Sequence, residues 1–173
     1  MFHGWDNYFL MIGSASAGLI GLLFVVVTLT SGFEREQAQR GQALYMTPTA
    51  MHFALALTIS AVAMAPGLSL TLTAVAFGLP ALVGAGNAVR SCVGIARPRS
   101  TTEPPHWSDM WCYGVAPLAI YLGLGVAAVA LLCRAQWAVQ LLAALLLILL
   151  LLGIRNAWDL VTFIAPRAKD SDS

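Results

Sequence analysis

Long apolar stretches alternate with short polar segments along this chain. The apolar stretches cover about residues 8–31, 48–65, 68–95, 110–132 and 137–164. A helix needs ~20 mostly apolar residues to cross the hydrocarbon layer of a bilayer, and each stretch is near or above that length. The pattern predicts an all-α integral membrane protein in which residues 1–173 form a single five-helix transmembrane bundle.

Proline and glycine mark the expected boundaries of these helices. Thr47-Pro48 places threonine at a helix cap and proline at the first helical position. Pro66-Gly67 predicts a tight turn, and Pro80 predicts a kink inside the third stretch. Residues 134–136 predict a second short turn, Pro166 predicts the end of the last helix, and segments 32–47 and 97–109 are polar connectors.

The composition agrees with a membrane protein. The chain is 59% hydrophobic and 10% charged, whereas soluble domains are about a quarter charged. The first apolar stretch is longer than the apolar core of a signal peptide, so we expect it to remain in the mature protein. A net charge of +1 without a run of basic residues gives no reason to expect nucleic-acid binding.

The basic residues predict the orientation in the membrane. If all five stretches cross, only Arg134 lies on one side, and the other eight of the nine Lys and Arg residues lie on the opposite side: Arg35, Arg40, Arg90, Arg97, Arg99, Arg155, Arg167 and Lys169. Basic residues concentrate on the cytoplasmic side of a membrane. We therefore expect the N-terminus outside, the C-terminus inside, and a multi-pass protein of the cell inner membrane.

Tryptophans support the same spans. Trp137 and Trp158 are 21 residues apart and bracket the last stretch. At ~1.5 Å per residue this separation is close to the ~30 Å thickness of the hydrocarbon layer. Trp5 on the outer side and Trp107 and Trp111 on the inner side fit the aromatic belts that flank a membrane.

No pattern of catalytic or metal-binding residues emerges. Cys92, Cys112 and Cys133 have no ligand spacing and are expected to be buried free thiols. The set His106, Asp109 and Cys112 matches no well-defined metal site. We predict no catalytic residue, no metal and no cofactor.

A group of polar residues is expected at the inner end of the bundle. Its members are His52, Asn87, Arg90, Arg155, Asn156 and Asp159. Ionisable groups inside a span are costly unless paired, so they are candidates for function. Two interpretations remain open. The residues line the inner mouth of an ion or solute path, or they anchor the bundle through pairs such as Arg155 with Asp159 and through contacts of the inner arginines with anionic lipid.

Small residues follow one face of the first stretch. Ser14, Gly18, Gly21, Val25 and Thr28 recur at helical spacing, and Gly13, Ala17 and Gly21 form a second ladder beside them. Such faces allow helices to approach closely in lipid. The face either packs within the chain, with the first span central and the third span as its neighbour, or surrounds the axis of a homo-oligomer.

Two sequence patterns stand at the ends of the chain. They are Trp5-Asp6-Asn7-Tyr8-Phe9 with Gly13, Ala17 and Gly21-Leu22-Leu23-Phe24-Val25, and later Arg155-Asn156-Ala157-Trp158-Asp159. In these two regions the sequence resembles a group of small bacterial multi-span membrane proteins without an assigned activity. The resemblance implies a bacterial inner membrane and no residue roles.

Three classes of function remain. Orientation by charge inserts every copy the same way, which favours a parallel homo-oligomer with cyclic symmetry. We expect an ion or small-solute channel with the first span near its axis. The alternative is a non-catalytic membrane scaffold or regulatory protein that acts through its cytoplasmic connectors. A membrane enzyme is the third class, because the candidate catalytic groups form an incomplete set.

Overall fold

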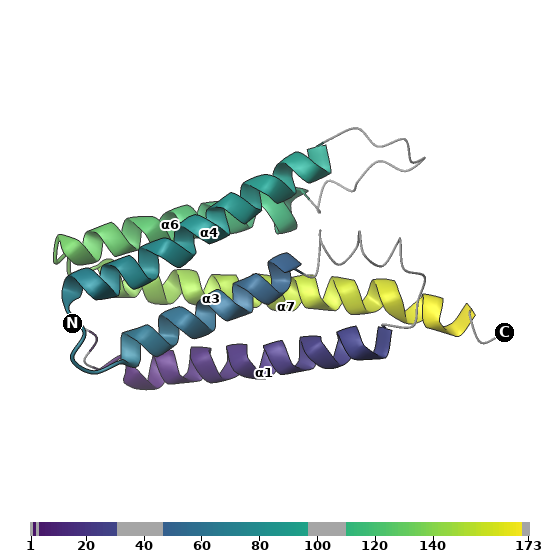
Figure 1. Cartoon of the computed structure of the whole chain (residues 1–173), viewed down its shortest axis with the longest axis horizontal. Helices are drawn as coiled ribbons and strands as arrows, with labels where there is room; N and C mark the ends of the chain where they lie inside the picture. Colours follow the sequence, from purple (N-terminus) through teal and green to yellow (C-terminus); the bar gives the residue numbers. More distant parts are fainter. Residues whose placement is uncertain (1, 3, 31–46, 97–109, 171–173) are drawn as a thin grey trace.

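The structure is a computed structural model, and it describes residues 2, 4–30, 47–96 and 110–170 (Figure 1). All regular structure in these ranges is helical. The elements are α1 (Asp6–Thr30), α3 (Thr47–Met64), α4 (Leu70–Ala96), the π-helix η2 (Trp111–Val115), α6 (Ala116–Leu132) and α7 (Ala138–Asp170). Because η2 runs directly into α6, the two form one span.

Five helical segments in the described ranges are long and apolar enough to cross a membrane: Asp6–Thr28, Thr47–Met64, Leu70–Ala96, Trp111–Leu132 and Ala138–Asp159. The predicted five spans are therefore confirmed, and they indicate a multi-pass membrane protein. The predicted bounds differ most at the end of α7, which continues to Asp170 and does not stop before Pro166. A proline removes one helical hydrogen bond and bends a helix without always ending it.

Successive helices run in alternating directions through the bundle (Figure 1). One end of the bundle, here called the connector end, is where α1, α4 and α7 finish and where α3 and η2 begin. The opposite end, here called the turn end, holds the short links α3–α4 and α6–α7. Connectors 31–46 and 97–109, with their predicted inner arginines and Trp107, lie outside the described residues.

The helices form two layers. α4 and α6 pack extensively on each other, as do α1 and α3, and α7 contacts α6, α3 and α1. Figure 1 shows the α4–α6 layer diverging from the layer of α1, α3 and α7 towards the connector end. The helix axes of the two layers are therefore farthest apart at the end where the polar cluster was predicted.

The expected position of the first span is corrected by this arrangement. Within the chain α1 lies at the edge of the bundle and packs mainly on α3 and α7, whereas the main partner of α4 is α6. The close approach of α1 depends on Gly13, where an added Cβ would lie 3.2 Å from the Cβ of Ser60. A central first span with the third span as its chief neighbour is thus wrong for the single chain.

The core is built largely by α7 and its neighbours. Leucines at helical spacing on α7 are fully buried, and they meet buried aromatic and aliphatic side chains of α3, α4 and α6: Leu142, Leu146, Leu149, Phe53, Ile59, Phe77 and Leu124. Large apolar side chains such as Phe24, Leu82 and Val129 are exposed on the outside of the bundle. An apolar exterior is what a lipid-facing surface requires.

At the turn end the chain is fixed by local hydrogen bonds and by aromatic contacts. α6 ends at Leu132, and Arg134, two residues later, has a left-handed φ of 56°. The Arg134 N–H donates to Leu131 O and the Ala135 N–H to Ala130 O, as in a Schellman cap. The Phe2 ring lies edge-on to Phe77, with centroids 6.0 Å apart. This contact joins the N-terminal segment to the α4–α6 layer.

Candidate functional site

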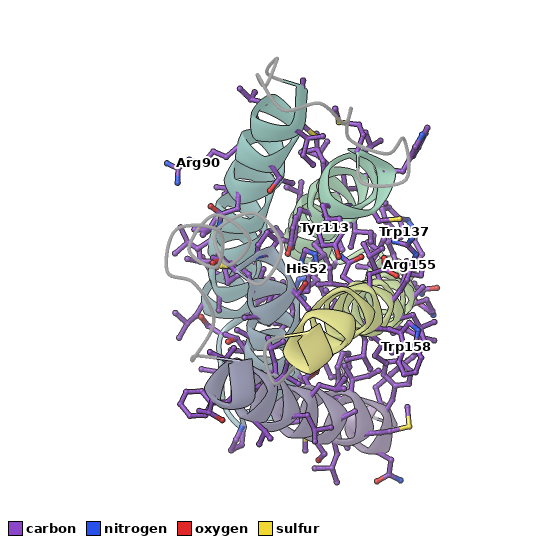
Figure 2. All side chains as sticks on the ribbon, turned by 90° about the vertical axis from the view of Figure 1, so that its right-hand side faces the viewer. His52, Arg90, Tyr113, Trp137, Arg155 and Trp158 are labelled. Carbon is purple, nitrogen blue, oxygen red and sulfur yellow. The ribbon has the colours of Figure 1, made fainter. Side chains whose placement is uncertain are left out.

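The predicted inner cluster separates into a buried group and a peripheral group. His52 and Asn156 are buried and Asn87 is half-buried. Arg90 is exposed, and the side chains of Arg155 and Asp159 are 44% and 41% exposed. Figure 2, viewed from the connector end, shows His52 in the interior and Arg90 and Arg155 on opposite sides of the bundle. All six residues lie towards the same end, but they do not form one cluster.

His52 forms the central contact of the buried group. Its Nδ1 lies 2.5 Å from the hydroxyl oxygen of Tyr121, so the pair joins α3 to α6. Tyr121 is 2% exposed and lies against Gly84 of α4, where an added Cβ would collide with the tyrosine ring. Glycine at position 84 is therefore what lets Tyr121 reach His52.

A second contact joins α3 to α4. The Asn87 side-chain amide donates to the sulfur of Met51, with Nδ2 and Sδ 3.4 Å apart. A thioether is a weak acceptor. The bond orients both side chains beside His52, and both of the groups that it joins are uncharged.

Asn156 joins α7 to η2. Its Nδ2 donates to Cys112 O at 3.2 Å, and its backbone oxygen accepts from the Tyr113 hydroxyl at 3.2 Å. The wide turn of a π-helix alters the local pattern of backbone hydrogen bonds, and such turns are frequent at functional sites. Gly114, in the same turn, is packed against Cys92 so closely that a Cβ would lie 2.5 Å from its sulfur.

Residues from several of these contacts line a small cavity between the layers, here called the junction cavity. It has room for about one water molecule. Its lining residues come from α3, α4, η2 and α6: Pro48, Met51, His52, Gly84, Asn87, Ala88, Tyr113, Pro117 and Tyr121. His52 Nε2 has no hydrogen-bond partner among the described residues. The cavity is thus lined by uncharged residues, with one polar nitrogen left to satisfy.

In the peripheral group, the carboxylate of Asp159 is paired with Arg155. Arg155 Nη1 and Asp159 Oδ2 are 3.2 Å apart, one helical turn from each other on α7, which confirms the predicted pair.

We expect Asp159→Asn to change the free energy of unfolding by less than about 1 kcal/mol, because half-exposed ion pairs contribute little. Unfolding in mixed micelles at low and high salt measures this effect. A larger loss would mean that Asp159 has a buried role.

The small-residue face of α1 is turned away from the rest of the chain. All five of its residues are exposed: Ser14, Gly18, Gly21, Val25 and Thr28. A Cβ added at Gly18 or Gly21 would meet nothing within 4 Å. In the neighbouring ladder only Gly13 is buried. The chain's own packing therefore uses Gly13 and leaves this face, here called the α1 face, open.

The described residues hold few groups suited to metal or covalent chemistry. Within residues 2, 4–30, 47–96 and 110–170 there is no group of three or more His, Cys, Asp or Glu side chains that could hold a metal ion. His106 and Asp109 lie outside the described residues. The prediction of three buried cysteines is wrong, because Cys92 and Cys112 are half-buried and Cys133, which follows the last turn of α6, is exposed.

Two members of the buried group were not anticipated from the sequence. Tyr113 and Tyr121 lie in an apolar stretch, where aromatic residues are common, and only their hydroxyl groups distinguish them. A buried tyrosine hydroxyl usually has a hydrogen-bond partner. That rule could have linked Tyr121 to a polar residue of another span, but the sequence could not have chosen His52.

Comparison of the chain with protein-family models, with curated proteins and with solved structures found no match.

Proposed function

We propose that this protein assembles through α1 into a parallel homo-oligomer and conducts ions or small solutes along the α1 face. The observation that carries the proposal is the exposure of all five residues of that face in the single chain. Small residues allow helices of neighbouring copies to approach closely in lipid. The hydroxyl groups of Ser14 and Thr28 supply polar positions along the same face.

The proposed orientation places the connector end in the cytoplasm of a bacterium and the turn end outside its inner membrane. Arg90 and Arg155 lie towards the connector end, whereas Arg134 lies in the α6–α7 turn. This distribution follows the positive-inside rule. A common orientation makes the α1 faces of all copies parallel, as cyclic symmetry requires.

A path between copies is favoured over a path through one chain. The junction cavity has room for about one water molecule. The core leucines of α7, including Leu142, Leu146 and Leu149, fill the middle of the bundle. We therefore place the conducting path where α1 helices of several copies meet.

Anionic lipid is the proposed partner at the cytoplasmic surface. Arg155 is engaged by Asp159 at 3.2 Å, whereas Arg90 is exposed and points away from the bundle in Figure 2. Exposed arginines near the ends of spans attract acidic headgroups. Arg90 is thus the arginine that we expect to meet lipid phosphate.

Ion flux from liposomes that contain the purified protein tests the channel proposal. We expect flux from the wild type and flux at the level of empty liposomes from Gly18→Leu, because a leucine would fill the space between α1 helices. Gly86→Leu is the matched control, since Gly86 is also an exposed glycine with nothing within 4 Å of an added Cβ, but it lies on α4. We expect normal flux from this control.

The same preparation separates the channel from the alternative of a non-catalytic scaffold. Crosslinking through a cysteine on the α1 face reports whether copies meet there. Crosslinked oligomers without flux for several ions and small solutes would overturn the channel and leave a scaffold assembled through α1. Neither flux nor crosslinking would overturn the α1 assembly as well.

A further inference from the structure

The junction cavity lies where the two layers begin to diverge. Its lining residues make three side-chain hydrogen bonds that cross between the layers: His52 with Tyr121, Asn87 with Met51 and Tyr113 with Asn156. A fourth bond between the layers joins Asn156 to Cys112. Figure 2 shows His52 and Tyr113 between these layers, away from the exterior of the bundle. The polar groups there hold α3 and α7 against α4, η2 and α6.

The protonation of His52 follows from its contact with Tyr121. The Tyr121 hydroxyl is buried, and His52 Nδ1 is its hydrogen-bond partner. A hydroxyl has one proton to donate, so the bond satisfies it when Tyr121 donates to Nδ1. In a neutral imidazole the other nitrogen then carries the proton. In this tautomer His52 Nε2 is a donor, and it has no acceptor among the described residues.

The surroundings favour a neutral His52. The titratable groups that line the cavity with it are Tyr113 and Tyr121, and none of the lining residues is charged. Arg155 and Asp159 pair with each other on the outside of α7, and Arg90 points away from the bundle. A charged imidazole without a counter-ion is costly inside a membrane.

A donor that is buried without an acceptor destabilises the fold, and a water molecule can remove that cost where the space and the polar partners suffice. The cavity has room for about one water molecule. The side chains of Asn87 and Tyr113 also line it and offer oxygen atoms to a bound water.

We propose that the junction cavity is a binding site for a single water molecule, which accepts a hydrogen bond from His52 Nε2 and bridges α3 to the α4–η2–α6 layer. The site lies within one chain and does not depend on the α1 assembly. It completes the polar contact between the layers at the cavity lined by His52, Asn87 and Tyr113.

Magic-angle-spinning NMR of the protein in bilayers, labelled with ¹⁵N-histidine, tests this site. His52→Gln identifies the His52 signals by their loss. We expect a neutral imidazole protonated at Nε2, with a cross-peak between that proton and water. A clear His52 signal without a water cross-peak, or with Nε2 unprotonated, would overturn the proposal.

Filling the cavity tests whether the water lies there. Ala88 lines the cavity, whereas Ala127 is equally buried on α6 and does not. We expect Ala88→Val to lose the cross-peak and Ala127→Val to retain it. If Ala88→Val does not fold, Asn87→Leu provides a second change in the half-buried lining, with the same expected loss. A cross-peak that persists in the folded lining variant would show that the water lies elsewhere.

Discussion

Replacing Gly84 by alanine is expected to lower the free energy of unfolding by about 1–3 kcal/mol, the usual cost of overpacking a core. The added methyl group would collide with the ring of Tyr121. That ring cannot easily move, because it is 2% exposed and its hydroxyl is bound to His52. The change therefore forces apart α4 and α6, the two helices of one layer. Reversible unfolding in mixed detergent and SDS micelles measures the loss.

Gly86→Ala is the control for this substitution. Gly86 lies on α4 two positions later, is exposed, and would place its Cβ in open space. Alanine is preferred over glycine in a helix by ~0.5–1 kcal/mol, so we expect this variant to be as stable as the wild type or more stable. Equal losses for the two variants would mean that contact with Tyr121 does not limit position 84.

The pair His52 and Tyr121 is expected to show a coupling free energy of about 1 kcal/mol in a double-mutant cycle, in the range of hydrogen bonds between membrane helices. His52→Phe leaves the Tyr121 hydroxyl buried without a partner, and Tyr121→Phe does the same to Nδ1. Each single variant should lose ~1–3 kcal/mol, the cost of an unsatisfied buried polar group. The double variant should lose less stability than the sum of the two single losses, because neither polar group is then left buried without a partner.

A second cycle provides the comparison. The Tyr8 hydroxyl donates to Ala143 O at 2.7 Å and joins α1 to α7, without contact to His52. His52→Phe and Tyr8→Phe should therefore have additive effects on the free energy of unfolding. Additive losses in the His52 and Tyr121 cycle would show that the short contact between them contributes nothing to stability.

The position of each polar residue along its helix could be predicted from the sequence, but the side of the helix on which it lies could not. The positions of His52, Asn87, Arg90, Arg155, Asn156 and Asp159 along their spans place them all near one end, and the structure agrees. Hydrophobic periodicity normally indicates which side of a helix is buried. It is weak here, because lipid and core are both apolar and the outer and inner faces carry similar side chains. The division of the cluster into buried and peripheral groups therefore required the structure.

The first span shows the same limit. Its small residues predict positions where a helix backbone can be approached closely. Gly13 is used in this way against α3, while Gly18 and Gly21 remain open. These glycines have similar neighbours in the sequence, so only the position of α3 determines which of them is contacted. The sequence could not indicate whether the chain's own helices or another copy would use each one.

The amino-acid sequence alone determined that this protein is a five-helix membrane bundle, since the length and apolarity of each span depend only on local composition. Tertiary structure alone decided that α1 lies at the edge, that Tyr121 reaches His52 past Gly84, and that Asn156 meets the π-helical turn. Those outcomes depend on how helices rotate and pair. Such choices are set by the fit of side chains from distant segments, which no single stretch of sequence contains.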